Sequence, residues 1–134
     1  MIRIRKIEGR CRGCNKEIDK RRRGISISAD KKDTIKLHKK VGCVSNFLEK
    51  VGNVTDKKFI DICKVEGVRI SPYLGSIKRC IVCDNKIEEG SNSISFNREG
   101  LDGWTNRMHI ECQERLKSEL IGCVERISLK GLFI

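Results

Sequence analysis

Cys80-Ile-Val-Cys83, followed after the segment 84–108 by His109-Ile-Glu-Cys112, is the stretch that decides the fold of this chain. Two cysteines separated by two residues can turn both sulfurs to one side of a tight turn. His109 and Cys112 lie one helical turn apart, and the dipole of a helix N-terminus favours thiolate charge. Four nitrogen and sulfur ligands with none left open describe a structural Zn2+ site. An iron–sulfur cluster fits less well, because such clusters normally take cysteine alone.

The same pattern occurs a second time, earlier in the chain. Under one constant shift along the sequence, Cys11, Cys14 and Cys43 align with the three later cysteines without a gap. His38 falls two residues out of register with His109, so we expect it to come from the end of a strand. The alternative is that His38 is a surface histidine and another residue supplies the fourth ligand. The sequence thus predicts two structural zinc ions per chain, one on each set.

Hydrophobic periodicity predicts the same small unit twice. Each unit would have a cysteine knuckle, then a hairpin with alternating apolar and polar residues, then a helix. The N-terminal segment, in which isoleucines alternate with basic residues, is expected to form an edge strand. The predicted hairpins cover 24–28 with 34–38 and 92–97 with 104–109, and the predicted helices cover 44–51 and 110–121, ended by Gly52 and Gly122.

The second set resembles the zinc finger of poly(ADP-ribose) polymerases. That finger has Cys-x2-Cys, a longer gap than here, and His-x2-Cys, often with a tryptophan shortly before the histidine, as Trp104 stands here. The chain is similar, more broadly, to treble-clef and LIM-type modules, which share the knuckle, hairpin and helix. The first set lacks the tryptophan and has His-x4-Cys. The resemblance implies a zinc-supported fold and recognition of DNA ends or distorted DNA.

We therefore expect an α+β protein made of two tandem, treble-clef-like zinc units. The predicted parts are a basic unit over residues 1–52, a helical connector over 53–76 and a neutral unit over 77–134 that ends in a strand. The connector helix would cover residues 56–65, with Thr55 as its N-cap. Because zinc binding contributes to folding, the two metal sites would offset a core that is poor in aromatic residues.

Composition narrows the class of protein. The chain has 134 residues, eight cysteines and a formal net charge of +11. No apolar stretch approaches the ~20 residues that a membrane span needs, and the N-terminus does not resemble a signal peptide. We expect a protein of the cytoplasm, nucleoid or nucleus rather than a secreted one, with cysteines as metal ligands instead of disulfides. Cys63 and Cys123, outside both sets, are expected to be buried, unreactive thiols.

Positive charge is concentrated in the first half. Residues 1–50 hold 16 basic and 6 acidic side chains, whereas residues 77–134 hold nine of each. This asymmetry favours contact with a polyanion, and the alternative is a solvated face that aids solubility. The candidate phosphate-binding residues are the basic ones around the first knuckle and hairpin: Arg3, Arg5, Lys20, Arg21, Arg22, Arg23, Lys31, Lys32, Lys36, Lys39 and Lys40.

These features predict nucleic-acid binding through backbone phosphates, with duplex DNA favoured over RNA. Phe47 is the one aromatic residue of residues 1–50, so base stacking on single strands is disfavoured. The alternative function is a protein-interaction adaptor that docks on a transcription or other nucleic-acid machine, with residues 77–134 meeting the protein partner. Enzymatic activity is not expected, because His38 and His109 are both assigned to zinc and no other histidine remains to act as a base.

Overall fold

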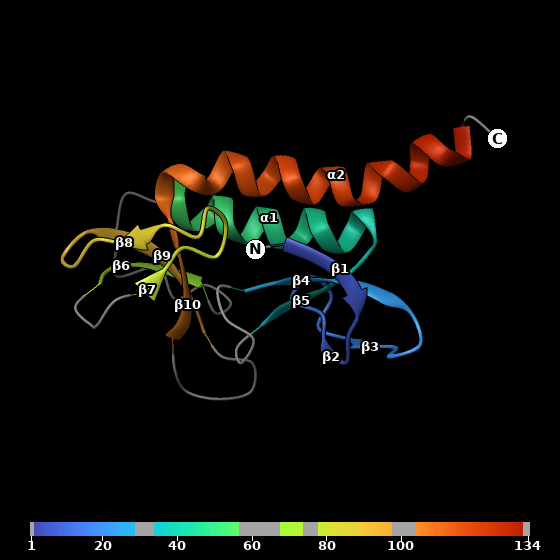
Figure 1. The fold of residues 1–134 in the computed structure, drawn as a ribbon, viewed down its shortest axis with the longest axis horizontal. Helices are drawn as coiled ribbons and strands as arrows, with labels where there is room; N and C mark the ends of the chain where they lie inside the picture. Colours follow the sequence, from blue (N-terminus) through green and yellow to red (C-terminus); the bar gives the residue numbers. More distant parts are fainter. Residues whose placement is uncertain (1, 29–33, 57–67, 74–77, 98–103, 133–134) are drawn as a thin grey trace.

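Two helices lie side by side over a layer of small antiparallel sheets (Figure 1). The computed structural model describes residues 2–28, 34–56, 68–73, 78–97 and 104–132. This is the mixed α+β architecture that the sequence predicts, with the two cysteine–histidine sets in tandem regions. Among the described residues, no helix is both long enough and apolar enough to cross a membrane.

The first half folds as a three-stranded sheet, a knuckle and a helix. The sheet has the order β1-β4-β5 and is antiparallel throughout, and the knuckle lies between two short paired strands. The predicted hairpin and edge strand are confirmed, the hairpin to within a residue at each strand. The elements are β1 (Ile2–Lys6), β2 (Gly9–Arg10), β3 (Glu17–Ile18), β4 (Arg23–Ile27), β5 (Ile35–His38) and α1 (Val41–Asp56).

The second half repeats this order, including a first strand that the sequence analysis missed. β6 lies within the predicted connector, yet it pairs with β9 as β1 pairs with β4. The register places Ile70 opposite Ile94 and Ile4 opposite Ile25, so the shift that aligns the cysteines does not align the first strands. The elements are β6 (Val68–Pro72), β7 (Lys78–Arg79), β8 (Lys86–Ile87), β9 (Asn92–Asn97), β10 (Trp104–His109), a 3-10 turn η2 (Ile110–Cys112) and α2 (Gln113–Leu132).

Both helices continue past the glycines that were predicted to end them. α1 runs through Gly52 to Asp56, and α2 runs through Gly122 to Leu132, so the predicted C-terminal strand is wrong. Glycine within a helix costs only about 1 kcal/mol. The apolar stripe of each helix continues beyond its glycine, with Val54 and Val124 both buried. Burial of that stripe outweighs the cost of the glycine.

Some predicted elements fall outside the described residues. Residues 57–67 are not described, and they contain Cys63 and almost all of the connector helix predicted for residues 56–65. The turns of both hairpins also fall outside the described residues. Thr55 lies inside α1, so it is not the N-cap of a new helix.

One hydrophobic core draws on both halves of the chain. Its fully buried residues include Ile25 and Leu37 of the first sheet and Ile94 of the second. Phe47 of α1 stacks on Phe96 of β9, with 5.8 Å between ring centroids. The two zinc regions are therefore packed against each other through α1.

Candidate metal centres

The first cluster gathers four ligands from three elements. Cys11 and Cys14 come from the knuckle between β2 and β3, His38 ends β5, and Cys43 lies in the first turn of α1. Their sulfur and nitrogen atoms all lie within 4.8 Å of one another. His38 Nδ1 is 3.2 Å from Cys14 Sγ and 3.7 Å from Cys43 Sγ. Tetrahedral zinc would hold such atoms about 3.6–3.8 Å apart, so His38 completes the first set.

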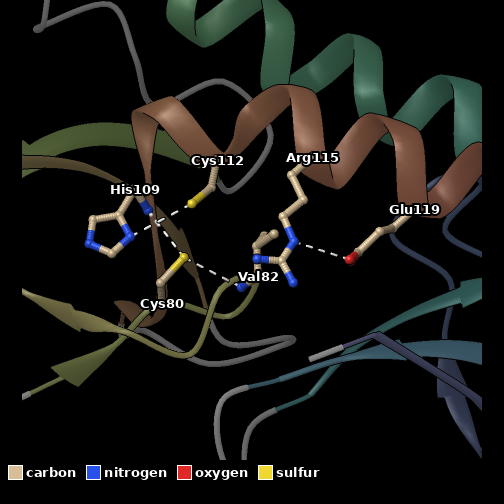
Figure 2. Close-up of polar contacts among 6 residues, drawn as sticks. All are labelled: Cys80, Val82, His109, Cys112, Arg115 and Glu119. Atoms are coloured by element: carbon tan, nitrogen blue, oxygen red, sulfur yellow. Dashed lines mark hydrogen bonds and ion pairs between the residues drawn. The ribbon is translucent and has the colours of Figure 1, made fainter.

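The second cluster has the same geometry. Cys80, Cys83, His109 and Cys112 also place their ligand atoms within 4.8 Å of one another. His109 Nδ1 is 3.3 Å from Cys83 Sγ and 3.7 Å from Cys112 Sγ, and Figure 2 shows His109 and Cys112 turned toward each other. The two clusters are each positioned to hold one zinc ion, as predicted.

Strand register explains why the histidines break the repeat. His38 pairs with Gly24 and His109 pairs with Ser93, and these two partners are related by the same shift that aligns the cysteines. The second hairpin is two residues longer and has an irregularity within β10. The segment from the histidine to the last cysteine of the set is two residues longer in the first unit, where Cys43 lies within α1 whereas Cys112 precedes α2. The two length differences cancel, so the histidines are structurally equivalent.

Backbone amides surround the first cysteine of each knuckle. Cys11 Sγ accepts the N–H groups of Gly13 and His38, both at 3.3 Å. Cys80 Sγ accepts those of Val82 and His109, both at 3.4 Å (Figure 2). Hydrogen bonds to a sulfur stabilise its thiolate form, which is the form that binds a metal.

Each histidine is oriented by a carbonyl oxygen from the strand after the knuckle. His38 Nε2 lies 3.0 Å from the oxygen of Glu17, and His109 Nε2 lies 3.2 Å from that of Lys86. A carbonyl can only accept, so Nε2 carries the proton and the lone pair of Nδ1 faces the sulfurs. Glu17 and Lys86 are equivalent in the repeat, but a backbone acceptor leaves no residue type in the sequence to reveal it.

A left-handed residue closes each knuckle. Asn15 has φ of 62° and Asp84 has φ of 61°, and asparagine and aspartate tolerate this conformation better than other non-glycine residues. Their N–H groups donate to the carbonyls of Cys11 at 2.8 Å and Cys80 at 3.0 Å. The polar residue after each Cys-x2-Cys is the sequence signal for this turn, and the sequence analysis did not use it.

The thiols within a cluster differ in their affinity for protons. Burial, followed by the charge of the first knuckle cysteine, raises the pKa of Cys43 and of Cys112 to about 12. Burial also acts to raise the pKa of Cys83, but hydrogen bonds, first from the backbone of Asn85, lower it to about 7. Metal binding therefore has to displace protons from Cys43 and Cys112, which makes it depend on pH.

A cation lies beside the second cluster. Arg115 of α2 forms an ion pair with Glu119 at 3.2 Å, visible in Figure 2. The pKa of Arg115 is raised first by Glu119 and then also by Cys83 and Cys112. The positive charge of Arg115 is thus near enough to Cys83 and Cys112 to interact with them, in addition to its ion pair with Glu119.

We expect Gly13→Ala to destabilise the zinc-loaded protein by about 1–3 kcal/mol, the usual cost of overpacking. A Cβ atom at Gly13 would overlap the carbonyl oxygen of Cys43 and lie 2.7 Å from its Cα atom. The matched control is Gly42→Ala in the same region, where a Cβ atom meets nothing within 4 Å. Urea unfolding at saturating zinc measures both. Equal stability of the two variants would contradict this role of Gly13.

Part of the predicted basic surface gathers on one sheet face. Arg3 and Arg5 are exposed on β1, on the face opposite the isoleucines of that strand. Cross-strand register aligns Arg3, Ser26 and Lys36 in one row. Arg5 Nε donates to Ser26 Oγ at 3.0 Å, which orients the guanidinium. Lys36 is half-buried and lies against Gly9.

The other predicted basic residues lie elsewhere. Lys20, Arg21 and Arg22 are exposed between β3 and β4, where Asp19 accepts the Arg21 N–H at 2.9 Å and pairs with its side chain at 3.4 Å. Arg23 begins β4 and is exposed. Lys39 and Lys40 precede α1, whereas Lys31 and Lys32 fall outside the described residues.

The second sheet carries a similar row that the sequence analysis missed. Register aligns Arg69, Ser95 and Arg107, and Arg69 Nε donates to Ser95 Oγ at 3.4 Å. Arg107 is buried, donates to Ser93 Oγ at 2.8 Å and lies 4.9 Å from the centroid of the Tyr73 ring. The shift that aligns the cysteines does not align Arg69 with Arg3, so the sequence repeat did not reveal that the two rows are equivalent. The second sheet thus carries cations of its own, although residues 77–134, to which Arg107 belongs, have zero net charge.

None of the family models, curated proteins and solved structures that were compared with the chain matches it. The assignment of the two zinc clusters therefore rests on the positions of the ligand atoms and of the groups that orient them. The interpretation of the basic surface rests likewise on the chain's own geometry and charge.

Proposed function

We propose that the protein is a zinc-dependent nucleic-acid-binding protein that holds the backbone phosphates of duplex DNA through its first unit. The observation that carries this proposal is the sheet face with Arg3, Arg5 and Lys36, where Ser26 holds Arg5 by its Nε atom. A guanidinium held at Nε still has both terminal NH2 groups to offer to a phosphate.

Charge and the zinc scaffold support this function. Arg3, Arg5 and Lys36 lie on strands of a sheet that a zinc site would hold in place, so they would meet a polyanion with little loss of entropy. Phe47 is buried in the core and does not serve as a stacking platform. Backbone contact with little base specificity follows, with DNA favoured over RNA. The resemblance of the second set to the poly(ADP-ribose) polymerase finger is consistent with DNA ends or distorted duplex as targets.

The second candidate is an adaptor that regulates a transcription or other nucleic-acid machine. The exposed side of α2 mixes acidic and basic residues, among them Glu114 and Lys117, as a protein-docking face does. Neither function requires catalysis, and both histidines of the chain lie in the metal clusters. Either function would place the protein in the cytoplasm, the nucleoid or the nucleus.

A salt titration of duplex binding tests the leading proposal. We expect affinity to fall steeply with salt, with a slope of about −0.9 per phosphate contact in a plot of log affinity against log salt. The double variant Arg3→Glu/Arg5→Glu should bind the duplex roughly 10- to 100-fold more weakly. Its salt slope should correspond to about two fewer phosphate contacts. Fluorescence anisotropy with a labelled generic duplex measures both quantities.

The matched control reverses two exposed charges of the second half, Lys86→Glu and Lys117→Glu, with the same change in net charge. This control should keep most of the affinity for the duplex and the full dependence of that affinity on salt. Equal weakening by the two double variants would show that net charge alone drives binding and would contradict the placement of the phosphate-binding face. Arg21→Glu/Arg22→Glu then measures whether the turn before β4 belongs to the same surface.

A further inference from the structure

A cleft of about 600 Å³ lies between the two halves of the molecule. One wall is apolar and consists of Ile2 and Ile4 of β1 with Val82 of the second knuckle. The other wall is the side of α2 that carries the small residues Ser118 and Gly122. Arg115, Glu119 and Cys123 complete this wall, because α2 buries its large apolar residues Leu116 and Leu120 in the core instead.

β1 is the edge of its sheet at this cleft. It pairs with β4 on one side, and within the part of the chain that the structure describes no strand pairs with its other side. Such an edge offers unpaired N–H and C=O groups to an added strand. Side chains of an added strand would alternate, one facing the cleft with Ile2 and Ile4 and the next facing the side of Arg3 and Arg5.

Charge selects what can pair with this edge. Three of the five residues of β1, Arg3, Arg5 and Lys6, are basic and exposed, and none is acidic. Pairing of β1 with a second copy of itself would bring like charges together, whereas an acidic strand would be attracted. Arg115 and Glu119 also line the cleft, but they are paired with each other at 3.2 Å.

We propose that β1 and the cleft bind an extended acidic segment of a partner protein, which adds to the sheet as a further strand. Apolar side chains of that segment occupy the cleft, and acidic side chains between them meet Arg3 and Arg5. The site needs both halves of the chain, since β1 forms one wall and α2 the other. This gives the neutral second half a role that phosphate binding does not. Because the same arginines border the phosphate-binding face, peptide and duplex compete.

The test uses the full zinc-loaded chain and two labelled synthetic peptides of equal length, one alternating valine with glutamate and one alternating valine with lysine. The glutamate peptide should bind at least tenfold more tightly than the lysine peptide by fluorescence anisotropy. Its binding should also protect β1 amides from hydrogen exchange, as strand addition requires. Equal binding of the two peptides, or unchanged exchange in β1, would overturn the proposal.

Gly122→Phe tests the cleft directly, because a Cβ atom at this position meets nothing within 4 Å. The new ring should fill the cleft and weaken binding of the glutamate peptide at least tenfold. Val41→Phe, at an exposed and uncharged position of α1 that does not line the cleft, is the matched control and should leave binding unchanged. If Gly122→Phe does not fold, Ser118→Leu takes its place, because Ser118 lines the cleft one turn earlier in α2. Undiminished binding of the glutamate peptide to the cleft-filled variants would refute the proposal. A dimer of the protein that pairs through β1 would refute it as well.

Discussion

Removal of zinc with a chelator is expected to unfold the protein, with loss of most of its helical and strand circular dichroism. The ligands of each cluster come from a knuckle, from the last residue of a hairpin strand and from the beginning of a helix, so one zinc ion would link all three elements. Zinc supplies about 10–16 kcal/mol in zinc-finger peptides, which matches or exceeds the ~5–15 kcal/mol that stabilises a typical domain. Without it, the thiolates of each cluster, of which Cys11, Cys43 and Cys80 are buried, would lose the cation that compensates their charge.

Native mass spectrometry of the untreated protein should show two zinc ions per chain. Addition of zinc to the chelated protein should restore the spectrum, whereas magnesium, which prefers oxygen ligands, should not. A chelated protein that keeps its full dichroism and its thermal transition would contradict a structural role for the metal.

The ligand sets were the most predictable part of the molecule. Spacing alone identified all eight ligands, because a Cys-x2-Cys turn and a helix start admit few alternatives for binding a tetrahedral ion. The strands of both hairpins were predicted equally well, since alternation such as that in residues 92–97 has one buried face. Strong local patterns therefore led to reliable elements.

Elements whose existence depends on tertiary contacts were not predictable. β6 has only a short apolar alternation, and it becomes a strand because β9 offers an edge for pairing. Gly52 and Gly122 satisfy the local rule for ending a helix, but the shared core continues to bury residues beyond them, such as Val54. Packing outweighs local propensity at each of these places.

The joint core is the main feature that no sequence pattern indicated. Two tandem repeats usually suggest two separate bodies, yet the stack of Phe47 on Phe96 places α1 of the first half on the sheet of the second. This arrangement also creates the cleft between β1 and α2. The two halves are thus expected to be coupled in stability as well as in binding.

Cys80→Ala is expected to release the second zinc and to destabilise the whole protein by more than about 4 kcal/mol, the range in which loss of a metal falls. Cys80 is fully buried, and its sulfur accepts two backbone N–H groups that alanine would leave without an acceptor. Zinc counting by native mass spectrometry and urea unfolding measure the two effects. The control is Cys123→Ala, a cysteine outside both clusters, which should keep both zinc ions.

The same variant tests the coupling between the halves. Loss of the second site loosens the strand that carries Phe96, and Phe47 then loses its stacking partner. Hydrogen exchange in α1 should therefore accelerate in Cys80→Ala, although α1 supplies a ligand only to the first zinc. Independent units would instead keep α1 as protected as in the unmodified protein, with the first zinc bound at full affinity. Accelerated exchange in α1 would show that the zinc sites stabilise one cooperative core, because the ligand removed lies on a different knuckle.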